Sequence, residues 1–378
     1  MGLDRRRFLA GLTGLAAGGA PTTLGLAQDA TPAASSSRDA DADFAILQRD
    51  FLVGIGIAGL EYGTKADTLP GIPGRQYFLP QDRLNYLASR GIRSIRLPFR
   101  WERVQPQMFG PLDRAYLGTL REALIHAARN RQKLLLDPHN YETILVDGTP
   151  QRLGTPELPA SALADLWRRL AGELSDHHDA LMGFDLLNEP SAKTVASETA
   201  WVEAAQSAIE AIREIDQRTF VFVEGWQHAS PFTWAATNPN LHRVVDPADR
   251  LVISMHQYFD AGNKHRGTYN SSDGSFAGEG GDLGDDLKFL GNFTTWLREH
   301  GRRGHVGEFG APNTPDWLPT MNQFMDTLIS EKIPFHAWGA FPVGSNYITQ
   351  LMRAPDGSDR LQATTVFSKL PQRDDRRP

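Results

Sequence analysis

The chain has 378 residues, of which 40% are hydrophobic and 22% charged, and its formal net charge is −6. This composition is typical of a globular protein with a sizeable core. The negative balance argues against a general nucleic-acid binder, which needs a clustered basic face. The chain has no cysteine, which excludes disulfides, zinc–thiolate sites, iron–sulfur clusters and cysteine nucleophiles.

The first 27 residues have the pattern of an export signal. Three arginines at positions 5–7 precede an apolar run rich in Gly and Ala, and small residues at 25 and 27 form a cleavage signal. The run is shorter than the ~20 residues that span a membrane. The order of arginines and apolar residues resembles a twin-arginine signal, which carries folded proteins. We expect residues 1–27 to be removed and the mature chain to be exported, periplasmic or secreted.

Polar segments flank the expected folded domain. Residues 28–43 are mostly Ala, Ser, Asp, Thr and Pro, with almost no large side chain, which predicts a flexible linker. Residues 372–378 are charged and end in proline, which predicts a frayed tail. Residues 44–371 then form a single domain, with no second globular pattern.

Short apolar runs recur eight times along this domain. Each is continuously apolar rather than alternating, which is typical of parallel strands buried on both faces. The runs are 51–57, 92–99, 133–139, 181–189, 219–224, 251–258, 305–309 and 334–341.

The segments between these runs often have a helical period. Over 113–130, four apolar residues recur at three- and four-residue steps on one face: Leu117, Leu120, Leu124 and Ala127. Similar patterns predict helices over 82–90, 161–175, 198–215, 285–300 and 317–330, whereas 228–240 has a weaker pattern. Eight strand–helix units in one chain predict the α/β class and a single (β/α)8 TIM barrel. No fixed-period repeat is visible, which argues against a solenoid.

A barrel of this kind has its active site at the C-terminal ends of its strands, so polar residues that end the runs are candidates. Glu189 and Glu308 end the fourth and seventh runs, which lie across the barrel mouth from each other. A lone glutamate at a strand end is most often part of an ion pair. Two of them, with the adjoining Asn188 and several aromatic residues nearby, favour a catalytic pair.

Hydrolysis of a glycosidic bond requires two such carboxyl groups. In a retaining enzyme they stand ~5–5.5 Å apart, and one protonates the leaving oxygen while the other attacks the anomeric carbon. Two carboxylates at this separation repel by roughly 3 kcal/mol at an effective dielectric constant of about 20, which corresponds to about two pKa units. We therefore expect one glutamate to stay protonated near neutral pH and the other to be ionised.

Two motifs resemble those of glycoside hydrolase family 5. They are Asn-Glu-Pro at 188–190 and Gly-Glu-Phe-Gly at 307–310, and they occur in the family's order within a resemblance that spans residues 50–345. The resemblance implies that Glu189 is the acid/base and Glu308 the nucleophile of a retaining enzyme. Because two carboxylates suffice for this reaction, we expect no cofactor and no metal.

The same resemblance implies substrate-binding or positioning roles for six more residues: Arg96, His139, Asn188, His256, Tyr258 and Trp338. The arginine would keep the nucleophile ionised. The first histidine would bond a sugar hydroxyl, and the asparagine would hold the 2-hydroxyl. The histidine and tyrosine of the sixth run would orient the acid/base and donate to the nucleophile, and the tryptophan would stack under the sugar.

Aromatic and acidic residues and one long loop also lie near the expected mouth. Five aromatic residues would either stack outer sugar units or pack loops: Trp101, Tyr141, Trp226, Phe259 and Tyr269. Four acidic residues favour structural roles: Glu61, Asp137, Asp185 and Glu224. The long Gly-, Ser- and Asn-rich segment 260–284 would border the cleft.

Segments 57–63, 139–141 and 256–260 look most like those of endo-β-1,4-glucanases, which implies endo-cleavage of β-1,4-glucan (cellulose type) by double displacement. A β-1,4-mannanase or another β-glycan hydrolase is the alternative on the same frame. A non-catalytic carbohydrate-binding protein is the alternative from another class. The expected partner is a polysaccharide, with no nucleic acid and no membrane for the mature form, and we expect a monomer.

A dinucleotide-binding enzyme is a rival interpretation, because Gly-x-Gly-x-x-Gly at 54–59 follows a predicted strand. That fingerprint requires a helix to begin there. The Pro- and Gly-rich segment 68–74 cannot be helical. Neither Gly-x-Ser-x-Gly nor His-Glu-x-x-His occurs in the sequence, so a serine hydrolase and a zincin are unsupported as well.

Overall fold

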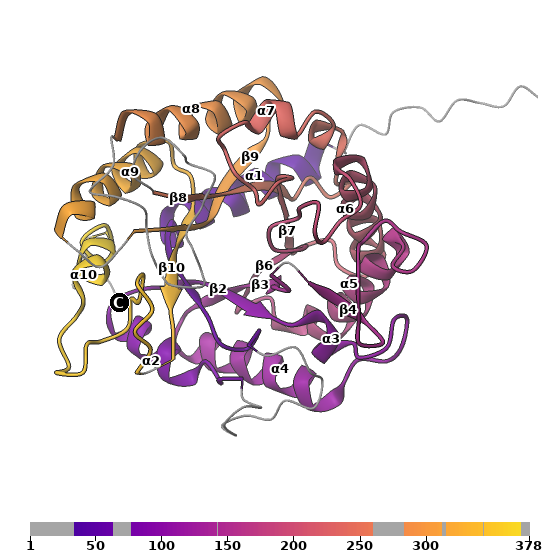
Figure 1. Ribbon diagram of the computed structural model, residues 1–378, viewed down its shortest axis with the longest axis horizontal. Helices are drawn as coiled ribbons and strands as arrows, with labels where there is room; N and C mark the ends of the chain where they lie inside the picture. Colours follow the sequence, from indigo (N-terminus) through magenta and orange to yellow (C-terminus); the bar gives the residue numbers. More distant parts are fainter. Residues whose placement is uncertain are drawn as a thin grey trace, which may run out of the picture. The chain divides into compact units, whose positions relative to one another are not determined.

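The computed structural model describes residues 34–62, 77–141, 143–259, 283–311, 315–342 and 344–371. Within these ranges eight strands close into a parallel barrel, in the order β1-β10-β9-β8-β7-β6-β3-β2. Helices surround the barrel (Figure 1). The prediction of a single (β/α)8 barrel is therefore confirmed. The predicted signal segment, the tail and most of segment 260–284, including Tyr269, lie outside the described residues.

The barrel strands coincide with the eight predicted apolar runs. They are β1 (Val53–Ile57), β2 (Ser94–Phe99), β3 (Lys133–Pro138), β6 (Leu181–Asp185), β7 (Phe220–Glu224), β8 (Leu251–Tyr258), β9 (Arg303–Gly310) and β10 (Phe335–Ala340). Nearly all of their residues are buried, because one face fills the barrel and the other packs against helices. The fourth run is shorter than predicted, so Asn188 and Glu189 follow the strand rather than end it.

The six predicted helices are present as α2 (Gln81–Ser89), α4 (Arg114–Arg129), α5 (Ala160–Leu174), α6 (Glu198–Arg213), α8 (Leu283–Glu299) and α9 (Leu318–Ser330). The weakly patterned segment 228–240 contains only the short α7 (Trp234–Thr237). Several short elements were not predicted: α3 (Trp101–Val104), β4 (Ile144–Val146), β5 (Thr149–Gln151), the 3-10 turns η1 (Ser175–His177), η2 (Leu241–Arg243) and η3 (Pro315–Trp317), and α10 (Leu361–Phe367). Among the described helices, none is long and apolar enough to cross a membrane.

The prediction of a flexible linker over 28–43 is wrong for residues 34–43. They form the first part of a helix, α1 (Ala34–Asp50). Most residues of this part of the helix are short and polar, and the large apolar residues that anchor the helix begin only at Phe44. Composition alone therefore gave no sign that the segment docks on the domain.

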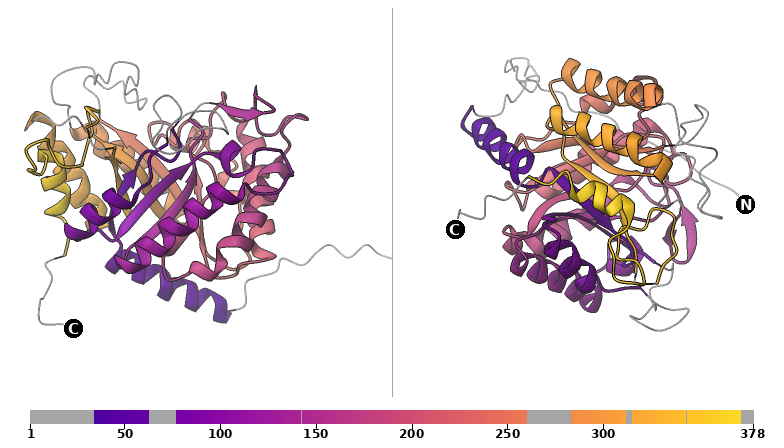
Figure 2. Two further views of the ribbon diagram at one scale, coloured as in Figure 1. Left: turned by 90° about the horizontal axis from the view of Figure 1, so that it is seen from below. Right: turned by 90° about the vertical axis from the view of Figure 1, so that its left-hand side faces the viewer.

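Helix α1 covers the N-terminal end of the barrel. Phe44 and Leu47 join a hydrophobic cluster with Leu135 and Phe220, which lie near the starts of β3 and β7. Two ion pairs add to this contact, Asp41 with Arg303 at 2.6 Å and Asp43 with Arg250 at 2.7 Å. Figure 2 (left) shows the helix lying across the end of the barrel opposite the β4–β5 hairpin. The folded domain thus begins at least ten residues before the predicted boundary at residue 44.

The first two glycines of the dinucleotide-like fingerprint make room for side chains of the neighbouring strand β10. A Cβ atom at Gly54 would lie 2.4 Å from the His336 ring, and one at Gly56 would lie 2.6 Å from the Trp338 ring. His336 in turn contacts Ser94 through Nε2 and His305 through Nδ1, each at 2.9 Å. Close strand packing, rather than phosphate binding, accounts for these two glycines.

The docking of α1 can be tested with two substitutions on the same helix. Phe44 is 6% exposed and Ile46 is 39% exposed. We expect Phe44→Ala to lower the free energy of unfolding by about 3 kcal/mol, because a buried aromatic ring is lost from the barrel end. Ile46→Ala should change it by less than about 1 kcal/mol. Urea unfolding followed by tryptophan fluorescence measures both, and equal effects would contradict the docked helix.

Candidate active site

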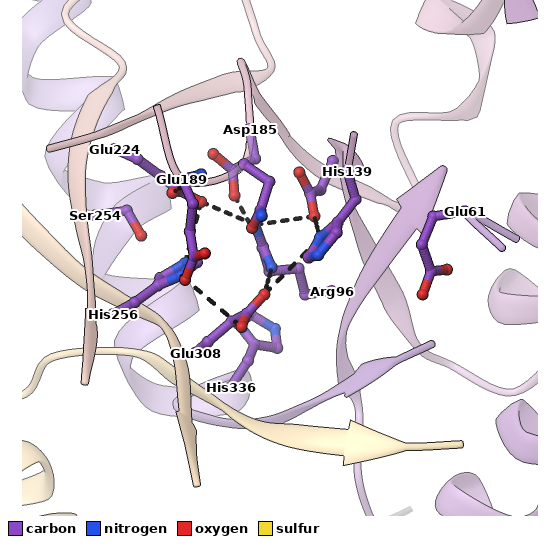
Figure 3. Close-up of polar contacts among 12 residues, drawn as sticks. Glu61, Arg96, His139, Asp185, Glu189, Glu224, Ser254, His256, Glu308 and His336 are labelled. Carbon is purple, nitrogen blue, oxygen red and sulfur yellow. Dashed lines mark hydrogen bonds and ion pairs between the residues drawn. The ribbon is translucent and has the colours of Figure 1, made fainter. Parts of the chain in front are cut away.

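Arg96 is the central cation of the barrel mouth. It lies on β2, and its guanidinium contacts four carboxylates that come from β3, β6, β7 and β9 (Figure 3). Nη1 donates to Glu308 at 2.6 Å and Nε donates to Asp185 at 2.9 Å. Nη2 donates to Glu224 at 2.8 Å and lies 2.9 Å from Asp137. Burial lowers the pKa of Arg96, but these carboxylates raise it more, so the side chain is a permanent positive charge.

The four buried carboxylates around this guanidinium also act on one another. Burial, and then the negative charges of Glu224 and Asp137, raise the pKa of Asp185 well above its usual range. These three acidic residues hold the arginine in place, which is the structural role expected for them from the sequence.

Glu308 is held in one orientation by two donors. It lies on β9 and is 4% exposed. Arg96 donates to its Oε1 at 2.6 Å, and the Tyr258 hydroxyl donates to its Oε2 at 2.7 Å. Both contacts were expected from the sequence, and together they engage both oxygens of this carboxylate and fix its orientation.

Glu189 reaches the same space from the loop after β6. Its backbone has φ of +46°, a left-handed conformation that is costly for a residue with a side chain. Its amide nitrogen donates to Glu224 Oε2 at 2.6 Å, which holds this backbone in place. One oxygen each of Glu189 and Glu308, together with a ring nitrogen of His256, all lie within 4.8 Å of one another. The two carboxyl groups predicted to converge therefore do so.

Two histidines face the carboxylate of Glu189. His256 Nδ1 lies 2.9 Å from Oε1, and His228 Nδ1 lies 3.7 Å from Oε2. Burial raises the pKa of Glu189, but the contacts with His228 and His256 lower it more, so the net direction is downward. Burial lowers the pKa of His256, but the charges of Glu224 and Glu308 raise it well above its usual range.

The expectation that one glutamate stays protonated near neutral pH considered only the repulsion between the two carboxylates. The structure adds the imidazoles of His256 and His228 beside Glu189, and these lower the pKa of Glu189.

The other predicted residues line the same site. His139 Nδ1 contacts Asp137 at 2.8 Å, and its ring lies parallel to that of Trp338 with centroids 5.4 Å apart. Burial lowers the pKa of His139, but Asp137 and Glu308 raise it more. The Oδ1 atom of Asn188 accepts a hydrogen bond from Arg96 Nη2 at 2.9 Å, so the side-chain NH2 group of Asn188 is the part that can donate a hydrogen bond. All eight residues singled out from the sequence thus belong to one cluster.

The aromatic residues expected either to stack outer sugar units or to pack loops fall into two groups by burial. Phe259 is fully buried and packs against Phe309 and Phe324. Trp101 and Trp226 are also buried, at 5% and 7% exposure.

Tyr141 differs from these three because it is 43% exposed. Its hydroxyl donates to Glu61 at 3.0 Å, and its ring meets the His139 ring edge-on. Glu61 is buried, and this burial raises its pKa. Figure 3 shows Glu61 set apart from the carboxylates around Arg96.

His228 was missed by the sequence analysis. It lies in the loop after β7, where none of residues 227–229 is a glycine, asparagine or aspartate that would indicate an unusual backbone. Gln227, His228 and Ala229 nevertheless have φ of +62°, +60° and +54°. The left-handed backbone that places this imidazole cannot be inferred from the residue types.

A parallel barrel with two converging glutamates at the C-terminal ends of its strands, one of them bound to a buried arginine, defines a barrel glycosidase. Residues 62–342 match the sequence model described as "Cellulase (glycosyl hydrolase family 5)", and the chain belongs to this family. The resemblance noted in the sequence is thereby confirmed, and the protein is a glycoside hydrolase.

Individual relatives agree with this assignment. The chain is 28% identical over 314 residues to "Probable endo-beta-1,4-glucanase B" of Aspergillus oryzae, which covers 81% of this chain and 86% of the relative. It is similar to the solved Pseudomonas stutzeri endoglucanase Cel5A in complex with cellobiose, with 33% identity and a TM-score of 0.73, over 84% of this chain and 91% of the other. It is also similar to the endo-beta-1,4-glucanase Xac0029 from Xanthomonas axonopodis pv. citri, with 28% identity and a TM-score of 0.70, over 83% and 96%.

The importance of Arg96 can be separated from that of a buried arginine in general. Arg213 on α6 is also buried and binds Asp246 through Nε and Nη2 at 2.7 and 2.8 Å, away from the site. We expect Arg96→Lys to lower kcat by at least about 100-fold, because a point charge cannot bind the nucleophile and three further carboxylates at once. Arg213→Lys should cost stability but keep kcat within about threefold. Glycosidase kinetics and urea unfolding of both variants check this, and a fully active Arg96→Lys would refute it.

Proposed function

We propose that the chain is a retaining endo-β-1,4-glucanase with Glu189 as acid/base and Glu308 as nucleophile. The observation that carries this proposal is the approach of the two carboxylates, with an oxygen of each within 4.8 Å of the other. Retaining glycosidases keep their carboxyl groups ~5–5.5 Å apart, whereas inverting ones need ~6.5–9.5 Å to admit a water molecule. The relatives named as endo-β-1,4-glucanases, and the one solved with cellobiose, support β-1,4-glucan as the substrate.

In the first displacement a Glu308 oxygen forms a bond to the anomeric carbon as the bond from that carbon to the leaving oxygen breaks. Arg96 and Tyr258 orient the nucleophile through its two oxygens. The leaving oxygen receives a proton from Glu189. Glu189 reacts in its neutral form, with the proton on Oε2, while Oε1 keeps its 2.9 Å contact with His256 Nδ1.

In the second displacement a water molecule attacks the anomeric carbon of the glycosyl–Glu308 ester. Glu189, now a carboxylate, takes a proton from this water, and the carbon–oxygen bond to Glu308 breaks. The nucleophile returns to its ionised form beside Arg96, and the proton returns to the pair formed by Glu189 and His256. Two inversions at one carbon give net retention of its configuration.

Activity and stereochemistry can be measured on the same samples. We expect new reducing ends from carboxymethyl-cellulose in preference to galactomannan, xylan and laminarin, and proton NMR of the first product should show the β anomer. Glu189→Gln and Glu308→Gln should each lower the rate on the preferred polymer by at least about 100-fold.

Glu102 provides a matched control, because it is a buried glutamate whose carboxylate binds the Arg100 and Asn140 side chains rather than the residues around Glu189 and Glu308. Glu102→Gln should retain most of the activity. Preference for galactomannan would keep the mechanism and change the substrate to a β-mannan. An α-anomeric first product, or a Glu308→Gln variant with more than a tenth of the activity, would exclude the proposed mechanism.

We also propose that the protein is exported by a twin-arginine route. The three arginines before the apolar run and the small residues at 25 and 27 support this. N-terminal sequencing of the protein recovered outside the cytoplasm should begin close after residue 27. Replacement of the arginines at 5–7 by lysine should leave the full-length precursor inside the cell, and unchanged export would argue for another route.

A further inference from the structure

The two oxygens of Glu189 have different environments. Oε1 contacts His256, whose side chain is 1% exposed, and Oε2 faces His228, whose side chain is 37% exposed. Glu189 itself is 27% exposed. Oε2 therefore faces the more exposed of the two histidines.

The backbone around His228 is held in an unusual conformation at this point. Three consecutive residues, Gln227, His228 and Ala229, have left-handed φ angles although none is glycine. Such conformations persist only when the surrounding structure fixes them, and they concentrate at functional sites.

The surroundings that fix this segment are the acid/base and its other histidine. The His228 amide nitrogen donates to the carbonyl oxygen of Pro190, the residue after Glu189, at 3.2 Å. The His256 amide nitrogen donates to the carbonyl oxygen of Ala229 at 2.9 Å. The main chain at 228–229 is thus tied to Pro190, the residue next to Glu189, and to His256.

We propose that His228 is a positioning residue for the acid/base, which keeps Oε2 of Glu189 directed toward the leaving group and stabilises the carboxylate left after the proton has been given up. The inference rests on the proposed function. The Nδ1–Oε2 distance of 3.7 Å is longer than a hydrogen bond. Contacts of this kind commonly tighten only in the reacting complex.

Leaving groups that differ in their need for a proton test this role. Cleavage of cellotetraose expels a sugar alkoxide that must be protonated, whereas cleavage of 2,4-dinitrophenyl β-cellobioside expels a phenolate that needs no proton. We expect His228→Phe to lower kcat/KM for cellotetraose by about 30-fold and for the aryl glycoside by less than about threefold. His228→Asn keeps a nitrogen near the Nδ1 position and tolerates left-handed φ, so it should restore most of the loss.

Gln227→Phe is the matched control, because it places the same ring one residue earlier on the same left-handed backbone. It should leave both kcat/KM values within about threefold of wild type, with thermal unfolding reporting any strain. Equal losses on the two substrates, no loss in His228→Phe, or no rescue by asparagine would each overturn the positioning role. A wild-type protein that cleaves neither substrate would instead overturn the proposed function.

Discussion

The guanidinium of Arg96 is the interaction on which the site depends. A fully buried cation is stable only when it is paired, and here four carboxylates from separate strands supply the pairing. One of these is the proposed nucleophile, which is thereby held in a fixed place. The crowding of negative charge at this point, together with burial, raises the pKa of Asp185. Stability and chemistry therefore use the same contacts at the centre of the barrel mouth.

Glu224 connects this arginine to the acid/base. One of its oxygens accepts from Arg96 at 2.8 Å and also lies 3.1 Å from His256, and the other accepts from the Glu189 amide nitrogen at 2.6 Å. The negative charge of Glu224 helps to raise the pKa of His256. The acid/base and the nucleophile are thus set by one buried carboxylate network, and a change at its centre reaches both.

The opposite end of the barrel serves stability. Helix α1 buries Phe44 and Leu47 against the starts of the strands, and its two ion pairs reach Arg250 and Arg303. The helix is anchored at the end of the barrel opposite the catalytic groups, where contacts in this architecture serve stability. Its polar composition resembled a linker because a helix that covers a barrel end needs only a narrow apolar stripe.

The sequence by itself determined the barrel, its eight strands and the two glutamates, because buried parallel strands appear as local apolar runs and their C-terminal ends meet at one mouth. It also indicated the contacts of Arg96 and Tyr258 with Glu308. Only the tertiary structure decided that α1 docks, that His228 faces Glu189 and that two imidazoles lower the pKa of Glu189. These depend on how side chains from distant strands approach one another and on a left-handed backbone that the residue types do not reveal.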